Sequence, residues 1–168
     1  REEAIQSLQT TFDDILIRES GVYGAPGGLQ PLDEVVSRLV QTVVFDKSAL
    51  VNINDLKSFD DYTYHHSLSV AVLSIAIGRQ MGFSSNQLNH LGMAAMMHDI
   101  GKTAVPQELI QKPSRLDNQE FALVKEHARA GTSYLINSSV GDEKLWRAVL
   151  CHHEKLDGGG YPLGLTAE

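Results

Sequence analysis

The chain has 168 residues, of which 42% are hydrophobic and 21% charged, the balance expected of one globular domain with a buried core. Its formal net charge of −7 argues against a DNA-binding surface, because phosphate backbones are met by clustered Lys and Arg. The single cysteine, Cys151, excludes an internal disulfide, no apolar run reaches the ~18 to 20 residues of a membrane span, and no signal peptide opens the chain. We therefore expect a cytoplasmic protein.

The N-terminal part predicts helices whose role is packing. Apolar residues recur at steps of three and four from Glu2 to Glu19, which predicts an amphipathic helix. Ser20 to Pro31 carries four glycines and two prolines and predicts a loop. The helical pattern resumes from Leu32 to Phe45, and a further short helix is expected from Asp46 to Leu56.

A longer helix is predicted from Asp61 to Met81, with an aspartate at its start and Gly82 at its end. Its centre, Leu68 to Ile77, is apolar almost all round, which is typical of a helix buried between others. His66 lies near its first turn. A lone histidine in such a place is more often a hydrogen-bonded core residue than a ligand.

The next helix is predicted to begin at a capping box formed by Ser84 and Gln87. It delivers His98 and Asp99 at its C-terminal end, and Gly101 is expected to end it in a left-handed conformation. A histidine beside a carboxylate is common by chance, so this pair gains meaning only from the other histidines of the chain.

Three more helices are predicted. The first is short and runs from Pro106 to Ile110, and the second is capped by Asp117 with Glu120 and carries His127. Asp142 caps the last helix, which ends in the adjacent pair His152 and His153. Beside these, Lys112 and Lys125 are expected to be solvated charges and Cys151 a small packing residue.

Neutral imidazole and carboxylate side chains are the ligand set of zinc, iron, manganese and nickel. The chain holds them in ordered motifs: Tyr62-Thr63-x-x-His66-Ser67, His98-Asp99-Ile100-Gly101-Lys102, Lys112-Pro113, Lys125-x-His127, and His152-His153-Glu154-Lys155-x-Asp157-Gly158-x-Gly160-Tyr161-Pro162-x-Gly164-Leu165. Over the stretch from Asp61 to Leu165, this order and spacing resembles the HD-GYP family of bacterial cyclic-dinucleotide phosphodiesterases.

The resemblance implies an all-α helical bundle of the HD superfamily and metal-dependent hydrolysis of cyclic di-GMP to linear pGpG, with further cleavage to GMP left open. It assigns His66, His98 and Asp99 to one divalent metal and His127, His152 and His153 to another, with Asp99 as the bridge. The metals are iron, manganese, nickel or zinc. Lys102 would steady the scissile phosphate, and Gly160 and Tyr161 would lie against the substrate.

Two departures from the family qualify this reading. The chain stops at Glu168, before the family's later aspartate and basic motif, so we expect a piece of a longer protein with region 1–57 ahead of an HD-GYP domain from 58 to 168. Tyr62 replaces a glutamate that some members use for a third metal, so at most two metals are expected. The alternative is a non-catalytic module that binds a cyclic dinucleotide or a GGDEF-domain partner, and the oligomeric state stays open.

Overall fold

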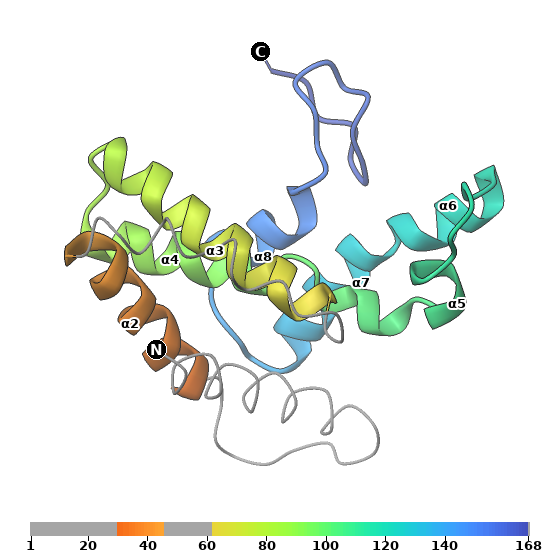
Figure 1. Ribbon diagram of the computed structural model, residues 1–168. Coiled ribbons are helices and arrows are strands. Elements are labelled where there is room, and N and C mark those ends of the chain that lie inside the picture. Colours follow the sequence, from red (N-terminus) through yellow and green to blue (C-terminus); the bar gives the residue numbers. More distant parts are fainter. Residues whose placement is uncertain (1–29, 46–61, 168) are drawn as a thin grey trace. The chain divides into compact units, whose positions relative to one another are not determined.

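A computed structural model describes residues 30–45 and 62–167 as helices joined by turns (Figure 1). No β-strand occurs in these two ranges, so the all-α prediction is confirmed for them. The predicted helices from Glu2 to Glu19 and from Asp46 to Leu56 lie outside the described residues. Most of the loop predicted from Ser20 to Pro31 lies outside them as well. The chain forms two compact units, residues 1–96 and 97–168.

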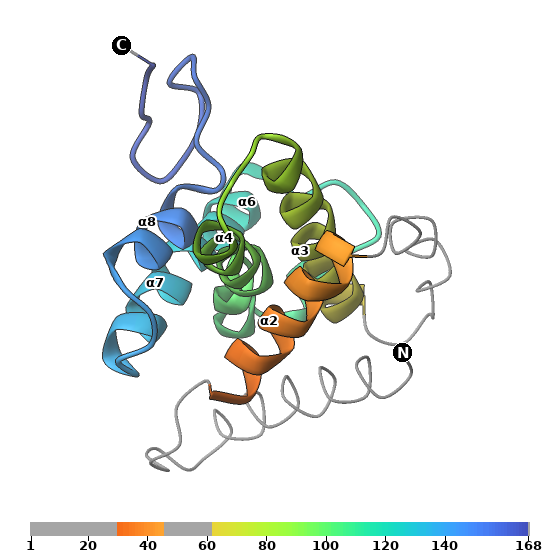
Figure 2. The same ribbon diagram turned by 90° about the vertical axis from the view of Figure 1, so that its left-hand side faces the viewer.

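The first unit contains α2 (Gln30–Phe45), α3 (Tyr62–Gln80) and nearly all of α4 (Ser85–Met97). Helix α2 lies along α3 in both views (Figures 1 and 2), and Arg79 Nη1 donates to the Val43 carbonyl at 2.7 Å between them. Helix α2 begins at Gln30, two residues before the predicted start. Pro31 therefore belongs to its first turn, where a fixed φ and a missing N–H cost nothing.

Glycines and a capping box set the path from α3 to α4. Gly82 ends α3 with a φ of 81°, as predicted, and the Phe83 N–H donates to the Gly78 carbonyl at 3.0 Å. The predicted capping box is also confirmed, because the Ser84 N–H donates to Gln87 Oε1 at 2.9 Å and the Gln87 N–H to Ser84 Oγ at 3.4 Å. A Cβ at Gly92 would lie 2.8 Å from a Val36 methyl, so glycine allows α4 to approach α2 closely.

The second unit contains a short 3₁₀ helix and four α-helices: η2 (Ile100–Ala104), α5 (Gln107–Ile110), α6 (Asn118–Lys125), α7 (His127–Asn137) and α8 (Glu143–Cys151). Helix α7 packs against both η2 and α8 (Figure 1). The fully or nearly fully buried Ala128, Leu135 and Val149 belong to α7 and α8. Helix α7 therefore forms the centre of this unit.

The prediction that Gly101 is a left-handed helix stop is wrong. Gly101 lies inside η2 and is not among the glycines with positive φ. A Cβ there would lie 2.0 Å from the His127 carbonyl oxygen and 2.4 Å from the Gly131 nitrogen. Glycine is needed at this position because the backbones of η2 and α7 touch.

The single helix predicted after Asp117 is two helices, α6 and α7, that meet at Glu126. The predicted capping box of Asp117 and Glu120 is present at the start of α6. At the junction the Glu126 N–H donates to the Leu123 carbonyl three residues earlier, which tightens the turn. The Nδ1 atom of His127 lies within hydrogen-bond distance of the Val124 carbonyl oxygen. None of the described helices is long and apolar enough to cross a bilayer.

Candidate metal centre

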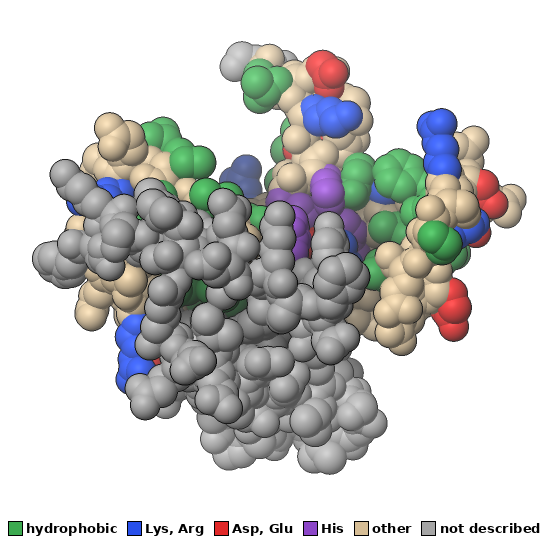
Figure 3. Space-filling view, in the orientation of Figure 1, with side chains coloured by type: hydrophobic (Ala, Val, Ile, Leu, Met, Phe, Trp, Pro, Cys, Tyr) green, Lys and Arg blue, Asp and Glu red, His purple; other side chains and the backbone are tan. Residues whose placement is uncertain are grey.

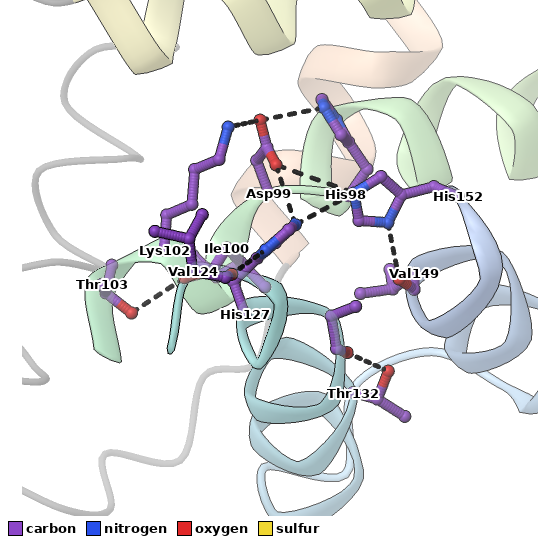
Figure 4. A network of polar contacts seen from close by, with 11 residues as sticks. His98, Asp99, Ile100, Lys102, Thr103, Val124, His127, Thr132, Val149 and His152 are labelled. Carbon is purple, nitrogen blue, oxygen red and sulfur yellow. Dashed lines mark hydrogen bonds and ion pairs between the residues drawn. The ribbon is translucent and has the colours of Figure 1, made fainter. Parts of the chain in front are cut away.

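Three segments of the second unit bring the predicted site residues together. His98 and Asp99 follow α4 directly, His127 opens α7, and His152 and His153 follow α8. Because α7 packs on both η2 and α8, these side chains meet at one place, and Figure 4 shows His98, Asp99, His127 and His152 there. On the face of the molecule in Figure 3, histidine side chains reach the surface as one patch with hydrophobic side chains beside it.

Asp99 lies at the middle of this group and is 3% exposed. Its Oδ2 is 2.5 Å from Lys102 Nζ and 3.1 Å from His98 Nε2, while its Oδ1 is 3.4 Å from His127 Nε2 and 3.7 Å from His152 Nε2. Burial alone would raise the pKa of Asp99. The neighbouring His152, His98 and Lys102 outweigh this and hold the pKa of Asp99 well below its ordinary value, so the carboxylate is an anion.

His127 and His152 are oriented by backbone carbonyls. His127 Nδ1 lies 2.6 Å from the Val124 carbonyl oxygen, and His152 Nδ1 lies 2.7 Å from that of Val149. A carbonyl oxygen only accepts hydrogen bonds, so we assign the ring proton of each neutral imidazole to Nδ1. The remaining nitrogen of each ring, Nε2, therefore carries a lone pair.

These two lone pairs point into the same space. The Nε2 atoms of His127 and His152 are 3.2 Å apart, and both face Asp99 Oδ1. Burial lowers the pKa of His127, which favours its neutral form. Electron-pair donors at this spacing repel one another unless a cation lies among them, so the arrangement fits a metal ion and also fixes the tautomers that a ligand needs.

His153 completes the group on the side of Tyr161. Its ring centre is 4.1 Å from that of His152, and it stacks on Tyr161 with centres 4.6 Å apart and planes inclined at 23°. Burial, with the nearby His152 and His127, lowers the pKa of His153 from 6.5 to about 4, so it is neutral at pH 7. Burial and the charge of Asp99 raise the pKa of Tyr161 to about 12, so its hydroxyl keeps its proton.

Asp99, His127, His152 and His153 each offer one ligand atom, and these four atoms lie within 4.8 Å of one another. Three imidazole nitrogens and a carboxylate oxygen are a donor set for a divalent transition metal. Cys151, which was predicted to be a packing residue, is half-buried and does not belong to this set.

His66 lies on α3, in the first unit, and its side chain is half-buried. His90, on α4, is exposed, and its Nδ1 lies 2.8 Å from the Asn86 carbonyl oxygen. The assignment of His66 as a ligand remains a prediction from its motif.

The glycine-rich loop after His153 is held by a glutamate whose role the sequence did not reveal. Glu154 Oε1 accepts the N–H groups of Leu163 at 2.6 Å and Gly164 at 3.2 Å, and its Oε2 accepts that of Leu165 at 2.9 Å. A Cβ at Gly160 would lie 2.4 Å from the Glu154 Cα. The loop thus folds back onto the residue that follows the two ligand-type histidines.

Two further contacts place Tyr161 and its neighbour. The Tyr161 N–H donates to the His153 carbonyl at 3.3 Å, and Arg129 Nη2 on α7 donates to the carbonyl of Pro162 at 3.0 Å. The Tyr161–Pro162 peptide bond is cis. Tyr161 is therefore fixed to both the histidine pair and, through Pro162, to α7.

The prediction that Lys112 and Lys125 are solvated charges is wrong. Lys112 Nζ lies 2.6 Å from Glu120 Oε1, and this ion pair joins the segment before α6 to its first turn. Lys125 Nζ lies over two rings, 5.2 Å from the centre of Phe121 and 5.9 Å from that of Tyr161. The surroundings of both ammonium groups depend on the segments that pack beside α6, namely the turn before it and the loop with Tyr161. The order of residues along the chain does not reveal this packing.

A family model described as "HD domain" matches residues 39–168. Among curated proteins, the chain is 37% identical over 135 residues to a cyclic di-GMP phosphodiesterase of Pseudomonas aeruginosa, covering 80% of this chain and 33% of that protein. It is 38% identical over 138 residues to 3'3'-cGAMP-specific phosphodiesterase 3 of Vibrio cholerae, covering 82% of this chain and 28% of that protein. The matches thus cover a third or less of the length of these curated relatives.

Among solved structures, the chain is similar to an HDG"Y"P protein from Bdellovibrio bacteriovorus, with a TM-score of 0.79. The match covers 97% of this chain and 52% of that one at 22% sequence identity. At this identity the similarity establishes the fold, and it agrees with the predicted all-α bundle.

Proposed function

Because this chain belongs to the HD domain family, we propose that it is a metal-dependent phosphodiesterase that hydrolyses cyclic di-GMP to linear pGpG, with further cleavage to GMP left open. One observation carries the proposal. The Nε2 lone pairs of His127 and His152 meet beside the buried, anionic carboxylate of Asp99. Such a group of electron-pair donors supports binding of a cation beside the glycine-rich loop that follows His153.

We assign the ligands of two divalent metals, from among iron, manganese, nickel and zinc. His127, His152 and His153 would hold one, and His98 with His66 would hold the other. Asp99 is the bridge in this assignment, because its two oxygens face different histidines: Oδ2 faces His98, and Oδ1 faces His127 and His152. The position of His66 in its sequence motif supports its inclusion.

When bound, such metals lower the pKa of a coordinated water molecule, and they place positive charge beside the phosphoryl oxygens. The remaining work falls to side chains of this protein. Lys102, whose ammonium lies 2.5 Å from Asp99 Oδ2, would place a point charge against the scissile phosphate. The protonated hydroxyl of Tyr161 would donate a hydrogen bond to the substrate, and Gly160 keeps the loop backbone close to Glu154 so that this ring faces the histidines.

A second substrate is favoured by one observation. A relative named for 3'3'-cGAMP is 38% identical to this chain, nearly the same as the 37% of a relative named for cyclic di-GMP. Both molecules present two phosphodiesters in one ring and differ in a base. The residues described around Asp99 would meet the phosphates of either molecule in the same way.

Product analysis tests the proposal. Protein stripped of metal and reloaded with Mn²⁺ or Fe²⁺ is incubated with each cyclic dinucleotide, and the products are separated by chromatography. We expect metal-dependent formation of a linear dinucleotide, with the exposed-histidine variant His90→Ala as active as wild type. Tight binding of the cyclic dinucleotide without any product would instead support the non-catalytic module, with a GGDEF-domain protein as the partner to test next.

A further inference from the structure

Lys125 differs from the two lysines that precede it in the second unit. The ammonium of Lys102 is paired with Asp99, and that of Lys112 is paired with Glu120. In residues 30–45 and 62–167, no carboxylate forms an ion pair with Lys125. Its charge is therefore available to an anion that comes from outside the described part of the chain.

Two aromatic rings hold the charge of Lys125 at the edge of the metal centre. Lys125 is the last residue of α6, two residues before His127, and its side chain is half-buried. Its Nζ lies over the rings of Phe121 and Tyr161, and Tyr161 in turn stacks on His153. A ring face attracts an ammonium without neutralising it, so these contacts place the charge and leave it intact.

The Phe121 ring keeps this arrangement in place. Its centre lies 6.2 Å from that of Tyr161 in an edge-to-face contact, and Phe121 is four residues before Lys125, on the same face of α6. Lys125, Phe121 and Tyr161 thus form one wall beside the histidines. The Lys125 ammonium belongs to this wall. On the side of Tyr161, the wall is held in place by the loop whose N–H groups donate to Glu154.

A cyclic dinucleotide carries two phosphodiesters, and only one of them is cleaved in a given step. The second phosphate keeps its negative charge, and a chain with a net charge of −7 needs a local cation to receive it. We propose that Lys125 binds this second, uncleaved phosphate and so makes the site selective for substrates with two linked phosphodiesters. The inference rests on the function proposed above.

Two substrates distinguish binding of the second phosphate by Lys125 from a merely structural role of Lys125 in the site. Cyclic di-GMP has a second phosphate, whereas bis(4-nitrophenyl) phosphate has a single phosphodiester. Lys125→Met keeps the apolar stem without the charge, and Lys125→Arg keeps the charge. We expect Lys125→Met to raise both KM and Kd for cyclic di-GMP about tenfold, as for loss of one charge-assisted hydrogen bond, with kcat changed less than about twofold.

The same variant should hydrolyse bis(4-nitrophenyl) phosphate with unchanged kcat/KM, and Lys125→Arg should restore most of the affinity for cyclic di-GMP. Lys144→Met, an exposed change in the first turn of α8, is the matched control and should behave as wild type. Unchanged affinity for cyclic di-GMP in Lys125→Met, or an equal loss on both substrates, would overturn the inference.

Failure of the proposed function gives a different result. If wild-type protein binds cyclic di-GMP but releases no product, the hydrolase proposal fails, while the Kd values of the two Lys125 variants still decide the inference. If the metal-loaded wild type shows no binding at all, both are overturned.

Discussion

His127 and His152 turn the same nitrogen, Nε2, toward each other at 3.2 Å, while the Nδ1 of each ring is engaged by a carbonyl three residues earlier in its own segment. The two rings are thus fixed by local backbone at the start of α7 and the end of α8. Their lone pairs face each other before any ligand arrives. This relationship is the physical basis for a preformed metal centre, and it makes the site sensitive to pH.

Acid should destabilise the metal-free protein through His153. Its pKa is 6.5 in an ordinary setting and about 4 in the folded protein. Between these two pH values the imidazole is protonated in the unfolded chain and neutral in the folded protein. Stability should fall as pH decreases from about 6.5 and level off, for this group, near pH 4. Urea unfolding in chelator at pH 7.5, 6 and 5 measures this effect.

The matched comparison is His153→Gln, which lacks the titrating group. Its free energy of unfolding should decrease less than that of wild type between pH 7.5 and 5. Parallel curves for the two proteins would mean that burial does not disfavour the charged form of His153.

Gly101→Ala should be severely destabilising. The added methyl would lie 2.0 Å from the His127 carbonyl oxygen and 2.4 Å from the Gly131 nitrogen, and both are backbone atoms that cannot rotate away. We expect a loss of about 3 kcal/mol or more, together with loss of metal binding, because η2 and α7 would have to separate. Thermal unfolding monitored by circular dichroism measures the loss.

Gly82→Ala is the control for the loss of glycine itself. Its φ of 81° strains any L-residue, but nothing lies within 4 Å of the new methyl, so a cost of about 1 kcal/mol is expected. A smaller effect of Gly101→Ala than of Gly82→Ala would refute the close approach of η2 and α7.

Glu154→Ala should release the glycine-rich loop. Three backbone N–H groups would lose their carboxylate acceptor, and hydrogen bonds to a charged group contribute about 1.5–3 kcal/mol each at most. Trypsin cleavage after the exposed Lys155 should accelerate by on the order of tenfold, while global unfolding shifts little. The comparison variant Glu143→Ala removes an exposed carboxylate from the first turn of α8 and should leave the cleavage rate unchanged. Equal rates in both variants would show that Glu154 does not restrain the loop.

Local rules were sufficient to predict several features of the fold. The capping boxes at Ser84 and Asp117, the stop at Gly82 and the cap at Asp142 depend on residues within four positions of each other, and all four are confirmed. The HD-GYP resemblance is likewise confirmed by the HD domain match, the relatives and the structural neighbour.

Features that depend on packing between segments were missed. Gly101 meets a backbone 26 residues further along at His127, so the sequence suggested a helix stop where the structure has a close contact. The wall around Lys125 depends on the turn at Glu126 and on Tyr161, far along the chain. Glu154 binds amides 9 to 11 residues away, a distance at which no short-range pattern indicates pairing.

Metal content of wild type and Asp99→Asn is the most direct test of this site. Each protein is loaded with Mn²⁺, desalted and analysed for metal per chain, with Asp117→Asn as control because Asn also serves as an N-cap. We expect Asp99→Asn to bind metal at least ~100-fold more weakly and to lose hydrolysis, while His153→Ala loses metal only in part. If Asp99→Asn kept as much metal as wild type and hydrolysed cyclic di-GMP at a similar rate, Asp99 would not be the residue that holds the centre together.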